Sequence, residues 1–189
     1  TALIVYDAVG NVVQEVDALG NVVRHEYDPN GNRTATVNAR GHRTTFTYDA
    51  LNRLVATTDP LGRTTAFEYD LNGNRTRVTD PLGQSTRFVY DGYNRLIQTV
   101  DPLGHAVTNA YDLLGRLTGV TDARGYETRF AYDALDRLVG VTDTENGTVA
   151  AAYDALGNRL SVTDPRGHQT TYAYDVLNRL VSETDPLGQ

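Results

Sequence analysis

The chain has 189 residues, and its 17 basic residues, all arginine, and 24 acidic residues give a formal net charge of −7. This acidic balance argues against a nucleic-acid-binding surface, which needs clustered positive charge. Cysteine is absent, which excludes a disulfide framework and thiolate metal sites. The sequence contains no run of 18 apolar residues, so no membrane span is predicted.

The chain is an array of repeats. A Tyr-Asp pair recurs every 21 residues, and nine periods of 21 account for all 189 residues without an insertion or deletion. A fixed period of this length is typical of repeat architectures, so we expect residues 1–189 to form one repeat domain. The recurring pairs are the candidate structural residues of the repeat: Tyr6 and Asp7, Tyr27 and Asp28, Tyr48 and Asp49, Tyr69 and Asp70, Tyr90 and Asp91, Tyr111 and Asp112, Tyr132 and Asp133, Tyr153 and Asp154, and Tyr174 and Asp175.

Each period contains two four-residue turns. Every turn opens with Asp, or with Asn at position 38, and its fourth residue is Gly, Asn or Asp. Those three residues tolerate a positive φ, which a type I turn followed by a left-handed residue requires. The opening carboxylate can accept a hydrogen bond from the backbone two residues on. The first turns span 7–10, 28–31, 49–52, 70–73, 91–94, 112–115, 133–136, 154–157 and 175–178, and the second turns span 17–20, 38–41, 59–62, 80–83, 101–104, 122–125, 143–146, 164–167 and 185–188.

The segments between the turns are predicted strands. Residues 53–58 and 63–69, for example, are rich in Thr, Val, Phe and Tyr and are too short for a useful helix. All four Phe stand two residues before a repeat Tyr, which places both rings on the same side of a strand. That slot is occupied, in chain order, by Ile4, His25, Phe46, Phe67, Phe88, Asn109, Phe130, Ala151 and Tyr172.

These elements predict an all-β fold of tandem 21-residue β-hairpin repeats. Strands joined by tight turns pair antiparallel, so the array reads as a meander of about eighteen strands. A twisted sheet of that size tends to curl or close, and the sequence leaves open whether nine repeats close or form an arc. The least regular period begins at Asp143, where the second turn loses Pro, Leu and Gly and where Ala150, Ala151 and Ala152 replace bulky strand residues.

No motif marks an active site. A recurring Asp suggests calcium, but the local role of Asp in turns is the stronger reading, and the nonapeptide of calcium-binding β-rolls does not occur. No pair of acids is singled out by its surroundings, as acid-base catalysis requires. His42, His105 and His168 follow a turn Gly in a polar slot, whereas His25 is expected to be a packed ring. We therefore expect no catalytic, cofactor-binding or metal-binding residue, no cofactor and no enzymatic activity.

Arginine recurs just after the first turn. Ion pairing with the turn carboxylates and stacking on the Tyr rings is the favoured use of these cations. Two alternatives remain: the Arg row could bind an anionic partner, and the Tyr row could bind a sugar. The arginines are Arg53, Arg95, Arg116, Arg137 and Arg179, with Arg33, Arg75 and Arg159 one residue later in their periods.

The run Tyr-Asp-x-Leu-Gly/Asn-Arg-Leu, followed by Val-Thr-Asp-Pro-Leu-Gly-x-x-Thr-x-Phe-x-Tyr-Asp, resembles the Rhs/YD-repeat family. The resemblance covers all nine periods and is close at residues 132–138 and 162–165. It implies large secreted or cell-surface proteins, including bacterial polymorphic toxins, insecticidal toxin-complex components and teneurins. Their β-hairpin repeats wind into a hollow spiral shell that often encloses a C-terminal toxin. The self-cleaving core region and the toxin domain of such proteins are not recognisable in this piece.

The sequence therefore favours a structural segment of an Rhs-like shell that encapsulates or presents a passenger domain. Its expected partners are neighbouring repeats and an enclosed passenger protein, with no nucleic acid, and its expected location is secreted or cell-surface. The alternative is an extracellular module that recognises a glycan or receptor. The start at Thr1 suggests a piece of a longer protein, and self-association is expected through sheet edges at Ala2 to Tyr6 and near Val181.

Overall fold

The structure is a computed structural model that describes residues 3–189, so Ala2 lies outside the described residues. The described residues form 18 strands joined by turns, and none of them belongs to a helix long and apolar enough to cross a membrane. The expected all-β fold is confirmed. The strands are β1 (Leu3–Tyr6), β2 (Val12–Val16), β3 (Val22–Tyr27), β4 (Arg33–Val37), β5 (Arg43–Tyr48), β6 (Leu54–Thr58), β7 (Thr64–Tyr69), β8 (Arg75–Thr79), β9 (Ser85–Tyr90), β10 (Leu96–Val100), β11 (Ala106–Tyr111), β12 (Leu117–Thr121), β13 (Glu127–Tyr132), β14 (Leu138–Thr142), β15 (Thr148–Tyr153), β16 (Arg159–Thr163), β17 (Gln169–Tyr174) and β18 (Leu180–Thr184).

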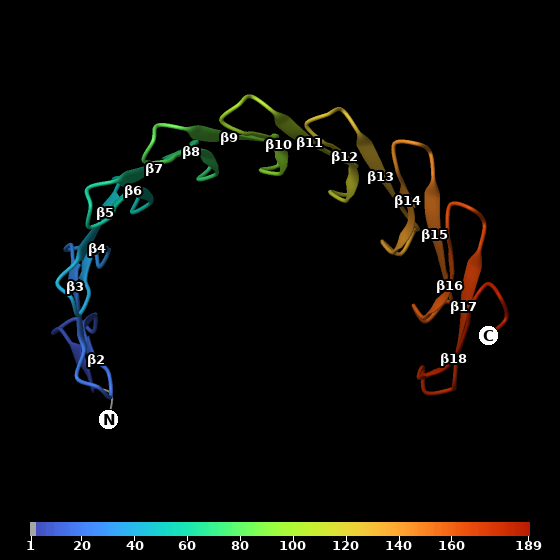
Figure 1. The fold of residues 1–189 in the computed structure, drawn as a ribbon, viewed down its shortest axis with the longest axis horizontal. Helices are drawn as coiled ribbons and strands as arrows, with labels where there is room; N and C mark the ends of the chain where they lie inside the picture. The colour runs from blue at the N-terminus through green and yellow to red at the C-terminus, as the bar shows by residue number, and fades with distance from the viewer. Residues whose placement is uncertain (1–2) are drawn as a thin grey trace. The chain divides into compact units, whose positions relative to one another are not determined.

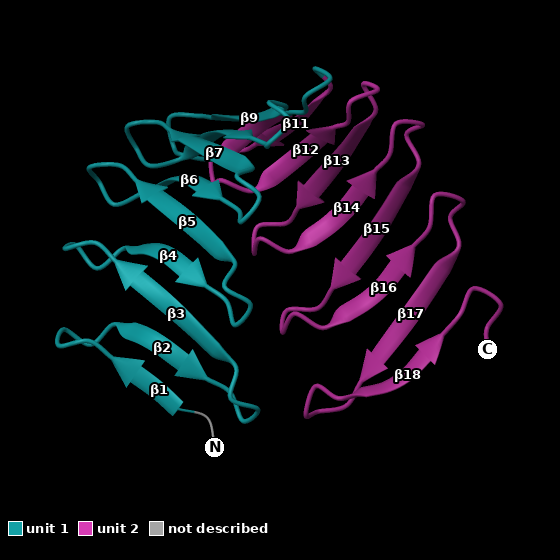
Figure 2. Ribbon diagram, turned by 60° about the vertical axis from the view of Figure 1, so that its left-hand side comes forward, with its two compact units in different colours: residues 1–95, 100–104 teal, residues 96–99, 105–189 magenta. Residues whose placement is uncertain are grey.

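The chain divides into two compact units (Figure 2). Unit 1 comprises residues 1–95 and 100–104, and unit 2 comprises residues 96–99 and 105–189. In unit 1, each strand from β1 to β8 pairs antiparallel with the next strand in the chain. In unit 2, the strands from β11 to β18 pair in the same way (Figure 1). The antiparallel meander predicted from the repeats is thus confirmed within each unit.

All eighteen predicted turns are present. In each of them the N–H of the fourth residue donates to the carbonyl of the opening residue, as Gly62 does to Asp59 at 2.9 Å. The fourth residue has a positive φ in every case, for example +79° at Gly62 and 59° at Asn52. The turn prediction is therefore confirmed down to the handedness of single residues.

The hairpins closed by first turns contain a bulge. In the β5–β6 pair, Thr47 lies opposite Ala56 and Tyr48 lies opposite Leu54, so that Val55 is the extra residue. The extra residue belongs to β6. The side chains of β5, which carries Phe46 and Tyr48, therefore alternate regularly between the two faces. The two rings therefore share a face, as their spacing predicts. We call this side of the sheet the aromatic face.

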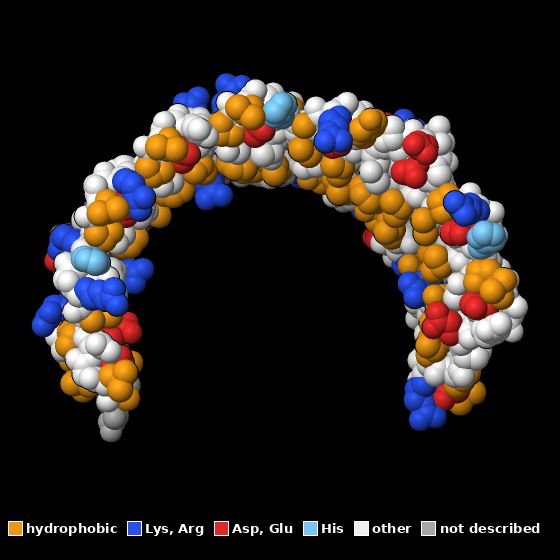
Figure 3. All heavy atoms as spheres, viewed as in Figure 1, with side chains coloured by type: hydrophobic (Ala, Val, Ile, Leu, Met, Phe, Trp, Pro, Cys, Tyr) orange, Lys and Arg blue, Asp and Glu red, His pale blue; other side chains and the backbone are white. Residues whose placement is uncertain are grey.

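The sheet is a single layer without an enclosed core. Among the described residues Ala35 is the only buried hydrophobic residue, and no large side chain is fully buried. Hydrophobic side chains gather along one face of the strands in each unit (Figure 3). The opposite face carries Thr together with ion pairs such as Arg77 with Glu68, at 3.1 Å. The rings of the aromatic face are half-buried within each hairpin, as Phe46, Tyr48 and Phe67 are.

Candidate functional site: the turn ladder and the aromatic face

Each turn carboxylate is occupied by its own turn. At Asp59, Oδ1 accepts the backbone N–H groups of Leu61 and Arg63 at 2.9 and 3.0 Å, and Oδ2 accepts Nε of Arg63 at 2.6 Å. Hydrogen bonds from the Arg63 side chain and then from its backbone N–H lower the pKa of Asp59, against the opposing effect of desolvation. The pKa is lowered in the same direction at Asp7, Asp17, Asp28, Asp49, Asp70, Asp91, Asp112, Asp133, Asp154, Asp164 and Asp175.

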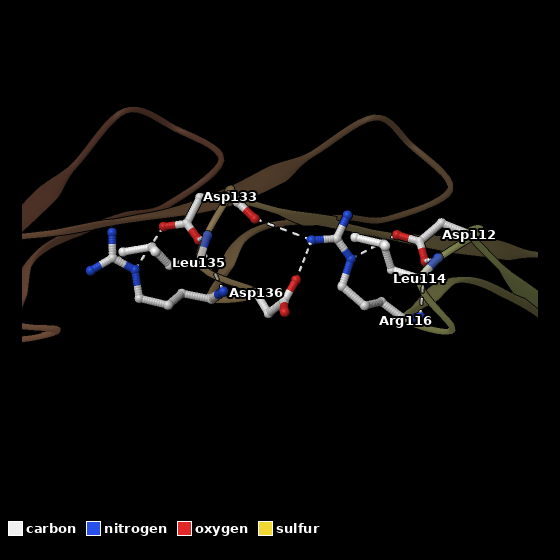
Figure 4. A network of polar contacts seen from close by, with 7 residues as sticks. Asp112, Leu114, Arg116, Asp133, Leu135 and Asp136 are labelled. Atoms are coloured by element: carbon white, nitrogen blue, oxygen red, sulfur yellow. Dashed lines mark hydrogen bonds and ion pairs between the residues drawn. The ribbon is translucent and has the colours of Figure 1, made fainter.

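In several periods the residue that follows a first turn links that turn to the next one. Arg116 donates from Nε to the carboxylate of Asp112 at 2.7 Å, and from Nη1 to the carbonyl of Asp133 at 3.1 Å and the carboxylate of Asp136 at 2.7 Å (Figure 4). Asparagine makes the equivalent link elsewhere, from Asn32 to Asn52, Asn74 to Asn94 and Asn158 to Asn178. We call these contacts the turn ladder. The sequence interpretation missed them because it treated Gly and Asn in the fourth position as equivalent.

In seven periods the repeat Tyr fastens its hairpin to the one before it. The hydroxyl of Tyr69 donates to the carbonyl of Leu54 at 2.8 Å, and the guanidinium of Arg53 lies 4.9 Å from the centre of the Tyr69 ring. Arg53 also pairs with Asp49 at 2.7 Å. The predicted use of the arginines, ion pairing and ring stacking, is confirmed here. The same hydroxyl-to-carbonyl bond is made by Tyr27, Tyr48, Tyr90, Tyr111, Tyr153 and Tyr174.

Three further arginines lie on the aromatic face among the rings. The guanidinium of Arg75 is 5.8 Å from the ring centre of Phe67 and 5.6 Å from that of Phe88, so two rings flank one cation. Arg33 lies over Phe46 at 5.2 Å, and Arg159 lies over Tyr172 at 4.7 Å. These distances fall within the range of cation–π contacts.

Two of the histidines, His25 and His168, make side-chain contacts within the repeats. The His25 side chain is 6% exposed and lies between Thr36 and Glu15, with Nδ1 3.1 Å from the hydroxyl and Nε2 3.2 Å from the carboxylate. The predicted packed ring is confirmed. His168 contacts its own turn carboxylate, Asp164, at 3.0 Å. Within residues 3–189 no group of three or more His, Asp or Glu side chains is arranged to hold a metal ion.

The repeats match a known family. The profile of the RHS repeat matches residues 6–43, 27–64, 48–82, 69–106, 111–149 and 153–189. The chain belongs to the RHS repeat family. The family's repeated Tyr-Asp pairs are, in this RHS repeat chain, the residues that form the turns and fasten the hairpins. A search of curated protein sequences returns no match.

Three solved structures match nearly the whole of this chain at low sequence identity. The TcdB2-TccC3-Cdc42 crystal structure is 19% identical over 97% of this chain, with a TM-score of 0.37. TcdB2-TccC3 without its hypervariable C-terminal region is 17% identical over 96%, with a TM-score of 0.40. A Tc holotoxin pore of Photorhabdus luminescens is 19% identical over 97%, with a TM-score of 0.37. This chain spans 14% of the length of each of these chains.

Proposed function

We propose that this RHS repeat chain is a structural segment of a shell that encloses or presents a passenger polypeptide, and that its nine repeats act as one domain without catalysis. The observation that carries the proposal is the aromatic face. No large side chain of this single-layer sheet is fully buried within the described range, and rings of the aromatic face such as Phe46 and Tyr48 are only half-buried. Extended apolar surfaces of this kind mark contact with another polypeptide.

The polar groups support a scaffold role. The turn carboxylates accept hydrogen bonds within their own turns, and the Tyr hydroxyls donate to backbone carbonyls, as Asp59 and Tyr69 illustrate. These groups hold hairpins together and are not arranged around a reacting bond. Covering of the Tyr69 ring by Arg53 also weakens the alternative of glycan recognition by the Tyr row. A secreted or cell-surface location follows from the family resemblance and forms part of the proposal.

Removing rings from the aromatic face is expected to weaken contact with a polypeptide. The combined substitutions Phe46→Asn, Phe67→Asn and Phe88→Asn use a residue that the same slot already holds at Asn109. The probe is reduced, carboxymethylated α-lactalbumin, which stays unfolded, and its affinity for the 189-residue chain is measured by fluorescence anisotropy. We expect a loss of about tenfold or more, because each ring contributes on the order of 0.5–1.5 kcal/mol beyond its buried area.

The matched control carries three asparagines on the opposite face, at Thr47, Glu68 and Val89. These residues directly follow the three Phe in sequence and therefore face the other way. The control is expected to bind the probe as the parent chain does. Equal losses in both variants, or no loss in the first, would contradict an aromatic binding face. Circular dichroism establishes that both variants retain the sheet.

Further repeats are the other proposed partner. The Arg179 side chain is 72% exposed, whereas that of Arg137 is 24% exposed. Arg137 lies 4.9 Å from the Tyr153 ring centre and donates to the carbonyl of Asp154 at 2.5 Å. A following hairpin, from this polypeptide or from another copy, would supply the same ring and carbonyl to Arg179. We expect the 189-residue chain to self-associate at moderate concentration, and a monomer at all concentrations in sedimentation velocity would count against this partner.

A further inference from the structure

One period of unit 2 has a hollow on its aromatic face. The hollow is lined by Leu138, Val149, Ala151, Tyr153, Arg159 and Val162, among others. It exists because Ala151 occupies the slot in which the neighbouring periods place Phe130 and Tyr172. Replacing a ring by a methyl group leaves the surrounding apolar side chains without contacts on one side.

Four periods earlier the slot of Ala151 holds Phe67, and that ring contacts an arginine. In β8, Arg75 lies between two rings, Phe67 from the preceding strand and Phe88 from the following one, at 5.8 and 5.6 Å. Arg159 begins β16 at the position of Arg75 in β8, four periods later. It keeps the following ring, Tyr172, at 4.7 Å.

The preceding ring is the one that Arg159 lacks. The residue eight places before Arg75 is Phe67, and the residue eight places before Arg159 is Ala151. One side of the Arg159 guanidinium is thus stacked, and the other side faces the hollow. Because a guanidinium attracts the negative face of an aromatic ring, a ring is the group that completes this arrangement.

We propose that the hollow at Ala151 is an anchoring site for an aromatic side chain of a partner polypeptide, whose ring stacks on Arg159 opposite Tyr172. The inference rests on the proposed function for the kind of partner, since an enclosed or apposed polypeptide would supply the ring. The apolar lining accepts the ring body, and Arg159 selects an aromatic ring over an aliphatic group of similar size.

The test uses a small probe, so its failure leaves the scaffold proposal standing. N-acetylphenylalanine amide is titrated into the isotope-labelled 189-residue chain, and NMR shifts of the Gly140 amide and the Arg159 Nε–H are followed. We expect saturable shifts with a Kd on the order of 1–10 mM, as befits one small ring in an open site. N-acetylcyclohexylalanine amide, which has a similar size but no π face, is expected to bind about threefold more weakly.

Two variants decide the outcome. Ala151→Phe fills the hollow from within and is expected to abolish the saturable shifts while raising the Tm. Arg159→Leu, a residue that β14 holds at the equivalent Leu138, is expected to remove the preference for the aromatic probe. Asn109→Phe adds a ring to the same slot of another strand and is the control that leaves binding unchanged. Shifts that do not saturate, or that persist in Ala151→Phe, overturn the proposal.

Discussion

Gly62→Val is expected to destabilise the chain by about 1–3 kcal/mol, because a β-branched residue would be forced into a positive φ. The φ of Gly62 is +79°, and a Cβ added there meets no heavy atom within 4 Å. The cost is therefore one of backbone conformation and not of crowding. The measurement is the free energy of unfolding in urea, followed by circular dichroism.

Gly62→Asn separates this cause from loss of glycine as such. Asn146 occupies the fourth position of another second turn with a φ of 64°, so asparagine is compatible with the turn. We expect Gly62→Asn to cost a small part of the valine effect, because Asn enters the left-handed region more readily than other non-glycine residues. Equal stability of the valine variant and the parent chain would show that the left-handed turn contributes little to stability.

The fold was predictable because the same turn and strand patterns recur in all nine periods. A single Asp followed three residues later by Gly is a weak signal, whereas the turns at Asp59 and Asp80 are identical in sequence. Register follows from the same repetition, since turns of fixed type fix the pairing of the strands on either side. The bulge at Val55 was not predicted, because it inserts no residue into the 21-residue period and so leaves no trace in the spacing.

The turn ladder was also readable, but only at twice the repeat length. Asn52, Asn94, Asp136 and Asn178 are 42 residues apart, and each accepts a hydrogen bond from the residue after the preceding first turn. A comparison of all nine periods does not show this pattern, because only alternate first turns have Asn or Asp in the fourth position. The hollow at Ala151 could not be predicted from the sequence. An alanine in an aromatic slot becomes informative only when the structure shows that two rings flank the guanidinium of Arg75.

Acid is expected to unfold the chain cooperatively, because many turn carboxylates have a lowered pKa. In Asp59 the hydrogen bond from the Arg63 side chain is the first cause, followed by the backbone N–H of Arg63; in Asp7 the corresponding donor is Asn11. A folded-state pKa below the ordinary value of 3.8 means that the unfolded chain binds more protons in acid. The stabilisation is thus complete above that value and is lost as the pH falls through the lower, folded-state value.

The turn at Asn38 supplies the control for acid unfolding. Its side-chain oxygen accepts the N–H groups of Arg40 and His42 at 2.9 and 3.0 Å without a titrating proton. The combined substitutions Asp17→Asn, Asp59→Asn and Asp164→Asn therefore keep the backbone contacts of the turns and remove three titrating groups. We expect a lower Tm than the parent at pH 7, because the bonds to the ionised carboxylates are lost, and a shallower fall of Tm between about pH 4 and pH 2. A parent Tm that is constant across that range, or a variant that falls as steeply as the parent, would show that the ionised turn carboxylates do not hold the hairpins.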